Sequence, residues 1–199
     1  MQVITLNQHA FEEHAGRLAD MVASGRGSSA YDAIVGVKRG GSLVCDAFCR
    51  HFPSDLYALR TDVFLQRPST RMKTGKVGAV LKSLPQWLLD LMRMAESRLL
   101  SLSRMSGRRR DIPRVVLPDV LARILKSGGQ PEILVIDDAI DSGDTLNAVI
   151  RAMADMNGRA RFRVAVMTVT TSRPVVTPDY CLYSNHTLIR FPWSNDYKE

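Results

Sequence analysis

Runs of apolar residues alternate with helical patterns along much of the chain. The clearest run, residues 133–136, consists of Ile-Leu-Val-Ile without a break. Such a run predicts a strand buried on both faces, which is typical of parallel sheets. Similar patterns predict strands over residues 3–6, 31–37, 55–61 and 161–169. Because helical patterns separate several of these strands, we expect an α/β fold with a mostly parallel central sheet flanked by helices.

Helices are predicted where apolar residues recur at helical spacing. The first follows Asn7, a residue type that often caps helices, and the clearest candidates cover residues 11–24, 42–52 and 118–126. A further helix begins after the 133–136 strand and ends near Met156, with Gly158 as its expected stop signal.

Residues from about 66–114 depart from this alternation and predict a helical insertion within a single domain of residues 1–199. Apolar residues recur at helical spacing between Val77 and Leu102, and Pro85 is expected to divide the stretch or to begin its second helix. An apolar face of this length must be buried. Packing on the parent core, a lid over the active site and a dimer surface are the alternatives.

Candidate chemistry follows the 133–136 strand. Asp137 and Asp138 come directly after it, at the end of a strand where open α/β sheets bind ligands. The turn after them opens a helix, whose first N–H groups are unpaired and can hold a phosphate. Carboxylates accept hydrogen bonds from sugar hydroxyls and bind Mg²⁺. The pattern therefore predicts a sugar phosphate, although Asp and Ser also favour caps and turns for purely local reasons.

A second loop, Lys38-Arg39-Gly40-Gly41, also ends a predicted strand and begins a predicted helix. Two cations and two glycines suit a diphosphate, because glycine lets the backbone approach a ligand closely. The alternative is a tight turn between strand and helix that needs only the glycines.

Both segments carry a resemblance to a known family. The stretch Asp137-Asp138-Ala139-Ile140-Asp141-Ser142-Gly143-Asp144-Thr145 resembles the phosphoribosyl-pyrophosphate (PRPP) motif of the type I phosphoribosyltransferases. Lys38-Arg39-Gly40-Gly41 resembles the pyrophosphate-binding loop of that family, in the expected order along the chain. The resemblance also implies a strained or cis peptide between Lys38 and Arg39.

The resemblance implies a role for each of these residues. Asp137 and Asp138 would bind the ribose hydroxyls and, directly or through water, Mg²⁺. The 5-phosphate would be bound by Asp141, Ser142, Gly143, Asp144 and Thr145, and the pyrophosphate by Lys38, Arg39, Gly40 and Gly41. Asp141 occupies the position that faces the base nitrogen in purine-type relatives, where it would be the catalytic base or hydrogen-bond partner; a local cap is its competing role.

Asp144 departs from the family pattern, and an acidic side chain beside a phosphate lowers the expected PRPP affinity unless it points to solvent.

The C-terminal third resembles the tail of bacterial xanthine-guanine phosphoribosyltransferases, which implies a small C-terminal hood segment. The resemblance rests on residues 168–174, 178–180 and 186–193. Val169 stands where that family has a lysine that binds the purine 6-oxygen, and Leu188 stands where it stacks an aromatic residue on the base. Candidate base-pocket residues are Val169, Leu188, Ile189, Phe191 and Trp193. For Phe191 and Trp193, packing in the core is an equally good interpretation.

Composition adds charge to this picture. With 27 Lys and Arg against 20 Asp and Glu, the net charge is +7, which suits anionic ligands such as pyrophosphate or nucleic acid. An arginine-rich cluster between Arg104 and Arg114 is either a solvated loop or a functional surface. Three cysteines without metal-binding spacing argue against a disulfide framework and a zinc site. No apolar run reaches membrane-spanning length and the N-terminus lacks a signal-peptide pattern, so a cytoplasmic protein without a membrane partner is expected.

The expected function is that of a Mg²⁺-dependent phosphoribosyltransferase. It would transfer the 5-phosphoribosyl group from PRPP to a nucleobase or related nitrogen heterocycle and release pyrophosphate. Mg²⁺ is the expected cofactor, PRPP and a small heterocyclic acceptor are the expected partners, and a homodimer is expected. The alternative is a non-catalytic regulator of the same fold that senses PRPP or binds nucleic acid, supported by the basic charge and the altered base pocket.

Overall fold

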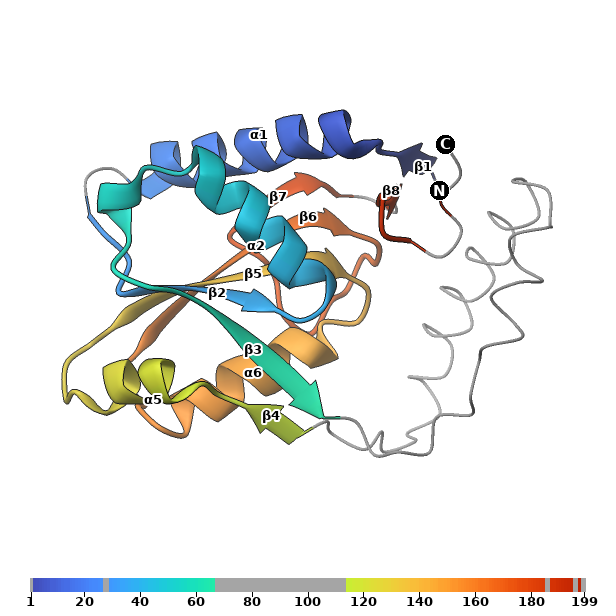
Figure 1. Cartoon of the computed structure of the whole chain (residues 1–199). Coiled ribbons are helices and arrows are strands. Elements are labelled where there is room, and N and C mark those ends of the chain that lie inside the picture. The colour runs from blue at the N-terminus through green and yellow to red at the C-terminus, as the bar shows by residue number, and fades with distance from the viewer. Residues whose placement is uncertain (1, 27–28, 67–113, 185–186, 195–196, 198–199) are drawn as a thin grey trace, which may run out of the picture.

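The computed structural model describes residues 2–26, 29–66, 114–184, 187–194 and 197 (Figure 1). Within these residues, six strands form one sheet in the order β4-β3-β2-β5-β6-β7. All neighbouring strands are parallel except β3 and β4. The strands are β2 (Ala33–Val37), β3 (Arg60–Gln66), β4 (Arg114–Val116), β5 (Glu132–Ile140), β6 (Arg161–Val169) and β7 (Tyr180–Tyr183). The predicted α/β fold with a mostly parallel sheet is confirmed.

Helices cover both faces of this sheet. Helices α1 (Gln8–Arg26) and α2 (Gly40–His51) lie on one face, and α5 (Asp119–Lys126) and α6 (Asp144–Ala154) lie on the other (Figure 1). Side chains of β5 alternate between the two resulting cores. Leu134 and Ile136 pack beneath α1 and α2, whereas Ile133 and Val135 pack against α5 and α6. The unbroken aliphatic run is therefore a strand buried on both faces, as expected for a parallel sheet.

A second, two-stranded sheet joins the two ends of the chain. Strand β1 (Gln2–Thr5) pairs in parallel with β8 (Thr187–Arg190), and the pair lies at the end of the main sheet toward which β2 points (Figure 1). Asn7 then caps α1, because its Oδ1 accepts a hydrogen bond from the Ala10 N–H over 2.8 Å. The expected C-terminal hood segment is thus paired with an N-terminal strand.

Some predicted element bounds were wrong. Residues 54–56 form a 3₁₀ helix after Pro53, and β3 begins only at Arg60, because its register with β2 places buried Val63 beside Val37. Helix α6 ends at Ala154, two residues before the predicted Met156. Its end is closed by the N–H groups of Met156 and Asn157, which both donate to the Met153 carbonyl.

The predicted insertion begins and ends in an antiparallel ladder. Gln66 at the end of β3 pairs with Arg114 at the start of β4, and Phe64 pairs with Val116. The helices predicted between these strands, together with Pro85 and the cluster of arginines up to Arg110, fall outside the described residues. None of the helices in the described part of the chain is long and apolar enough to cross a membrane.

Candidate functional site

The order of the strands places the candidate site between β2 and β5. From β2 the chain continues outward to β3, whereas from β5 it continues in the other direction to β6 and β7. Strands β2 and β5 are direct neighbours, and Gly36 near the end of β2 pairs with Ile136 of β5. In open α/β sheets, ligands bind at the carboxyl ends of the strands where this direction reverses.

The Lys38–Gly41 loop packs on the end of β5 at this point. A methyl group on Gly40 would overlap the Asp138 carboxylate. A Cβ on Gly41 would lie 2.7 Å from both Asp137 Oδ1 and the Ile136 carbonyl oxygen. Both glycines are therefore needed, because the backbone of the loop lies directly on the carboxylate pair. The peptide between Lys38 and Arg39 is cis, as the family resemblance implied.

Asp137 and Asp138 lie near the end of β5 rather than after it. The strand continues to Ile140, which pairs with Val169 of β6, because the pairing of β5 with β6 extends past both aspartates. Asp137 is buried, and its Oδ1 accepts a hydrogen bond from the Asp138 N–H over 2.9 Å. Asp138 Oδ1 accepts one from the Ala139 N–H over 2.9 Å.

The environment of these two carboxylates disfavours their charge. Burial, reinforced by repulsion from Asp138, raises the pKa of Asp137 well above its usual range. Burial likewise raises the pKa of Asp138. Among the described residues, no lysine or arginine forms an ion pair with either carboxylate.

This pair suits a divalent cation and sugar hydroxyls. The described part of the chain holds no group of three or more His, Cys, Asp and Glu side chains arranged to bind a metal. Two carboxylates alone fit Mg²⁺, which keeps several water ligands and often takes the rest from substrate phosphates. Either the cation or hydroxyl donors would offset the repulsion between Asp137 and Asp138.

The predicted phosphate turn lies between β5 and α6. Gly143 has a φ of 83°, a left-handed conformation that favours glycine. A Cβ there would also lie 2.8 Å from the backbone nitrogen of Val176. The neighbouring Val175 N–H donates to the Ser142 carbonyl over 2.9 Å, so the loop after β6 packs on the turn. This contact could not be predicted from sequence patterns, because the two segments are distant along the chain.

Helix α6 begins with Asp144 and Thr145. The Asp144 N–H donates to Ser142 Oγ over 3.2 Å. An acidic residue in the first turn of a helix interacts favourably with the helix dipole. This interaction gives Asp144 a local role that does not require contact with a phosphate.

Asp141 is oriented by Thr170, which was not among the predicted site residues. Thr170, buried just after β6, donates from Oγ1 to Asp141 Oδ1 over 2.7 Å. The Thr170 N–H donates to the Ile140 carbonyl over 2.9 Å, which fixes Thr170 beside the end of β5. Gly143, rather than Asp141, is the N-cap of α6. The geometry therefore argues against the cap interpretation of Asp141.

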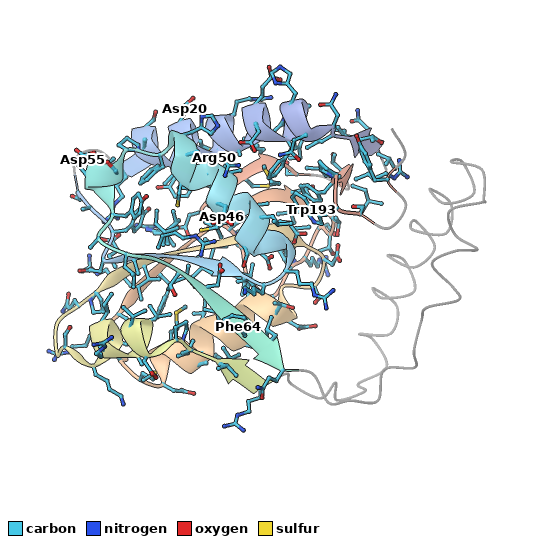
Figure 2. All side chains as sticks on the ribbon, viewed as in Figure 1. Asp20, Asp46, Arg50, Asp55, Phe64 and Trp193 are labelled. Atoms are coloured by element: carbon cyan, nitrogen blue, oxygen red, sulfur yellow. The ribbon has the colours of Figure 1, made fainter. Side chains whose placement is uncertain are left out.

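Neither cationic side chain of the other loop forms an ion pair with these carboxylates in the described part of the chain. Lys38 Nζ is 4.0 Å from the centroid of the Phe64 ring, a cation–π contact. Phe64 projects from β3 and is 43% exposed (Figure 2). Arg39 is the exposed N-cap of α2. In this structure the loop thus presents backbone, rather than the Lys38 side chain, to the carboxylate pair.

The candidate base-pocket residues separate into different environments. Ile189 and Phe191 are buried in the core beneath α1. Trp193 stacks on Phe191 with ring centroids 4.7 Å apart and meets Phe11 edge-on at 4.9 Å (Figure 2). These contacts correspond to the core-packing interpretation of Phe191 and Trp193.

Val169 and Leu188 lie elsewhere. Val169 packs in the opposite core, with α5 and α6, whereas Leu188 is only partly buried. By the alternation of β8, Leu188 and Arg190 share the face opposite Ile189. Arg190 is buried and donates from Nη1 to Thr5 Oγ1 of β1 over 2.9 Å. This buried cation was not among the predicted site residues.

Comparisons with known proteins agree with this architecture. A family model described as the phosphoribosyl transferase domain matches residues 4–199. The xanthine-guanine-hypoxanthine phosphoribosyltransferase of Helicobacter pylori superposes with a TM-score of 0.59 at 18% identity, over 96% of this chain and 94% of that one. The purine phosphoribosyltransferase of Pyrococcus horikoshii superposes with a TM-score of 0.57 at 17% identity, over 98% and 95%.

A hypothetical protein from Neisseria gonorrhoeae, solved with bound ppGpp, superposes with a TM-score of 0.56 at 15% identity, over 96% of this chain and 89% of that one. No curated protein matches this chain. At these identities the solved structures show a shared fold, and the family model independently matches nearly the whole sequence. The chain therefore belongs to the phosphoribosyl transferase domain family.

Proposed function

We propose that this protein transfers the 5-phosphoribosyl group from PRPP to a nitrogen of a nucleobase or related heterocycle, with Mg²⁺ as cofactor. The observation that carries the proposal is the contact of the Lys38–Gly41 loop with the two aspartates near the end of β5. Gly40 and Gly41 lie directly against Asp138 and Asp137 where the strand order reverses. One ligand placed there can contact both loops at once, as a molecule with a phosphate, a sugar and a diphosphate requires.

Each part of PRPP has a candidate partner in this arrangement. The turn over residues 141–145 and the N-terminus of α6 would bind the 5-phosphate. The ribose hydroxyls would donate to the carboxylates of Asp137 and Asp138. The backbone of Gly40 and Gly41 would bind the pyrophosphate, with Lys38 and Arg39 nearby. Bound Mg²⁺ would supply positive charge that neutralises the pyrophosphate as it leaves.

In the proposed reaction, the lone pair of an acceptor nitrogen forms a bond to the anomeric carbon of the ribose. The bond from that carbon to the pyrophosphate oxygen breaks, and its electron pair leaves with the pyrophosphate. Positive charge grows on the sugar ring during this step, so fixed carboxylates at Asp137 and Asp138 stabilise the transition state. Asp141, oriented by Thr170, would accept the acceptor's proton or a hydrogen bond from its N–H.

The acceptor is proposed only as a chemical class. Val169 and Leu188 replace the lysine and the aromatic residue that the resemblance implied for a 6-oxopurine. Hydrogen-bond partners discriminate between bases far more strongly than apolar contacts do. A heterocycle other than the usual 6-oxopurines is therefore compatible with this site. The apolar pattern of residues 66–114 supports the further proposal of a homodimer.

The test combines binding with turnover. Isothermal titration of PRPP with Mg²⁺ is expected to show one saturable site, and chelation of the metal with EDTA should weaken it. The same preparation is then screened for pyrophosphate release with purines, pyrimidines and related heterocycles. Pyrophosphate release with one acceptor supports the enzyme. If PRPP binds but none of the acceptors causes pyrophosphate release, the result supports the non-catalytic regulator. Absence of PRPP binding contradicts the enzyme and the PRPP-sensing regulator.

A further inference from the structure

A charged network behind the Lys38–Gly41 loop joins β3 to the first turn of α2. Ser42, the third residue of α2, donates from Oγ to Asp62 Oδ1 over 2.7 Å. Arg60 donates from Nη1 to the same oxygen over 2.7 Å and from Nη2 to the Ser42 carbonyl over 3.2 Å. The residue that follows Gly40-Gly41 is thus held by its side chain and by its backbone.

The network depends on the absence of a side chain at Gly36. A Cβ on Gly36 would lie 2.7 Å from Asp62 Oδ1 and 3.0 Å from Ser42 Cα. Gly36 pairs with Asp62 of β3 on one side and with Ile136 of β5 on the other. The bare backbone of β2 therefore lets Asp62 and the start of α2 come together above the strand.

These contacts hold the first turn of α2 from both neighbours of β2. On the β5 side, Gly41 packs against Asp137 and the Ile136 carbonyl. On the β3 side, Ser42 is bonded to Asp62 and Arg60. The backbone N–H groups at the start of α2 have no partners inside the helix and can bind an anion. Their position relative to the Asp137–Asp138 pair is therefore set partly by Asp62.

Charge within the network is balanced by Arg60. A lone Asp62 carboxylate behind a pyrophosphate-binding loop would repel the ligand. Arg60 forms ion pairs with Asp62 over 2.7 Å and with Asp46 over 2.8 Å. Asp46 lies one turn farther along α2 (Figure 2), its side chain is 54% exposed, and the ion pair described for it in this network is with Arg60. It therefore serves as a matched control for Asp62.

We propose that Asp62 is a positioning residue for the pyrophosphate part of PRPP, acting through Ser42 and neutralised by Arg60. This inference rests on the proposed function. The phosphate turn at residues 141–143 follows β5 and makes none of these contacts. Loss of Asp62 should therefore weaken the recognition of pyrophosphate and leave the recognition of the 5-phosphate unchanged.

The test compares three ligands by isothermal titration in the presence of Mg²⁺: PRPP, inorganic pyrophosphate and ribose 5-phosphate. Asp62→Ala and Ser42→Ala should each bind PRPP and pyrophosphate roughly tenfold more weakly, because a hydrogen bond to a charged group is lost. Both variants should bind ribose 5-phosphate like the wild-type protein. Asp62→Asn keeps an acceptor oxygen for Ser42 and should lose less affinity. Asp46→Ala should bind all three ligands like the wild-type protein.

Two results would overturn the inference. Equal weakening for all three ligands would mean that Asp62 has a merely structural role, and wild-type affinity in Ser42→Ala and Asp62→Ala would mean that it has no positioning role. If Asp62→Ala does not fold, Ser42→Ala decides, because it removes only one hydroxyl. If the wild-type protein binds no PRPP, the proposed function fails together with the inference. Normal PRPP binding with unaffected variants overturns the inference alone.

Discussion

At the scale of single residues, the hydrogen bond from Thr170 to Asp141 is the contact most directly tied to catalysis. Thr170→Val replaces the hydroxyl with a methyl group of similar size, so Asp141 loses its orienting donor. We expect kcat with the best acceptor of the screen to fall about three- to tenfold, the cost of one hydrogen bond. PRPP affinity should not change. Steady-state kinetics with titration of PRPP separates these two quantities.

Two further variants bear on this prediction. Thr170→Ser keeps the donor and should retain most of the activity. In an Asp141→Asn background, Thr170→Val should have little additional effect, because residues that act as a unit are not additive. A full additional loss in that background would show that Thr170 acts by another route.

The buried carboxylate pair gives a second prediction at this scale. Asp137→Asn combined with Asp138→Asn removes two carboxylates whose charged form burial disfavours. Because the amides are neutral and less costly to bury, the double variant should fold with an equal or higher melting temperature and should lose PRPP binding. Thermal unfolding and isothermal titration measure the two properties. Unfolding of the variant, or normal PRPP binding, would contradict the role assigned to the pair.

At the scale of elements, the packing of α2 on β5 depends on Gly41. Its Cβ would meet the backbone carbonyl of Ile136, which cannot move aside as a flexible side chain can. Gly41→Ala should therefore destabilise the protein by about 1–3 kcal/mol, the usual cost of overpacking, and weaken PRPP binding. Gly129→Ala is the matched control, because nothing lies within 4 Å of a Cβ there. Urea unfolding of both variants gives the comparison, and equal stability would contradict the close packing.

The junction of α1 with β5 predicts a dependence of stability on pH. Arg26 donates to Glu132 over 2.5 Å, and this hydrogen bond holds the pKa of Glu132 below its usual value. A lowered acid pKa contributes stability that is present above the unfolded-state pKa, about 4.3 for glutamate, and is lost as pH falls through the folded value. Glu132→Gln should cost about 1–3 kcal/mol at pH 7 and less under acidic conditions. Urea unfolding of the wild-type protein and Glu132→Gln at pH 7 and at an acidic pH measures the two costs. An equal cost at the two pH values would contradict the prediction.

The elements also show which features of the structure sequence patterns can predict. The aliphatic run of β5, the Asn7 cap and the two loops were predictable because each depends on residues close together in the chain. The contacts of Thr170 with Asp141 and of Asp62 with Ser42 were not, because they follow from strand order and register. The strand predicted over residues 55–61 was wrong for the same reason: the pairing of β3 with β2, rather than local composition, determines where β3 begins.

At the scale of the whole molecule, the candidate site connects the two layers of helices. Helix α2 begins at one loop and packs in the core shared with α1, whereas α6 begins at the other turn and packs in the opposite core. A ligand that contacts both loops therefore joins elements from both faces of the sheet. Because such a ligand binds the folded state alone, it should stabilise the fold as a whole. At a PRPP concentration 100 times Kd with Mg²⁺ present, the free energy of unfolding should rise by about 2.7 kcal/mol.

Thermal unfolding monitored by circular dichroism tests this prediction, with ribose 5-phosphate and Mg²⁺ alone as comparisons. Ribose 5-phosphate lacks the pyrophosphate, so it can contact only the β5 side of the site and should raise the melting temperature less than PRPP at the same concentration. The Asp137→Asn and Asp138→Asn double variant should show no rise with PRPP. An equal rise with both ligands would mean that the Lys38–Gly41 loop contributes nothing to binding. In that case PRPP would not join the two layers of helices. This conclusion would hold whether or not the protein transfers the phosphoribosyl group to an acceptor.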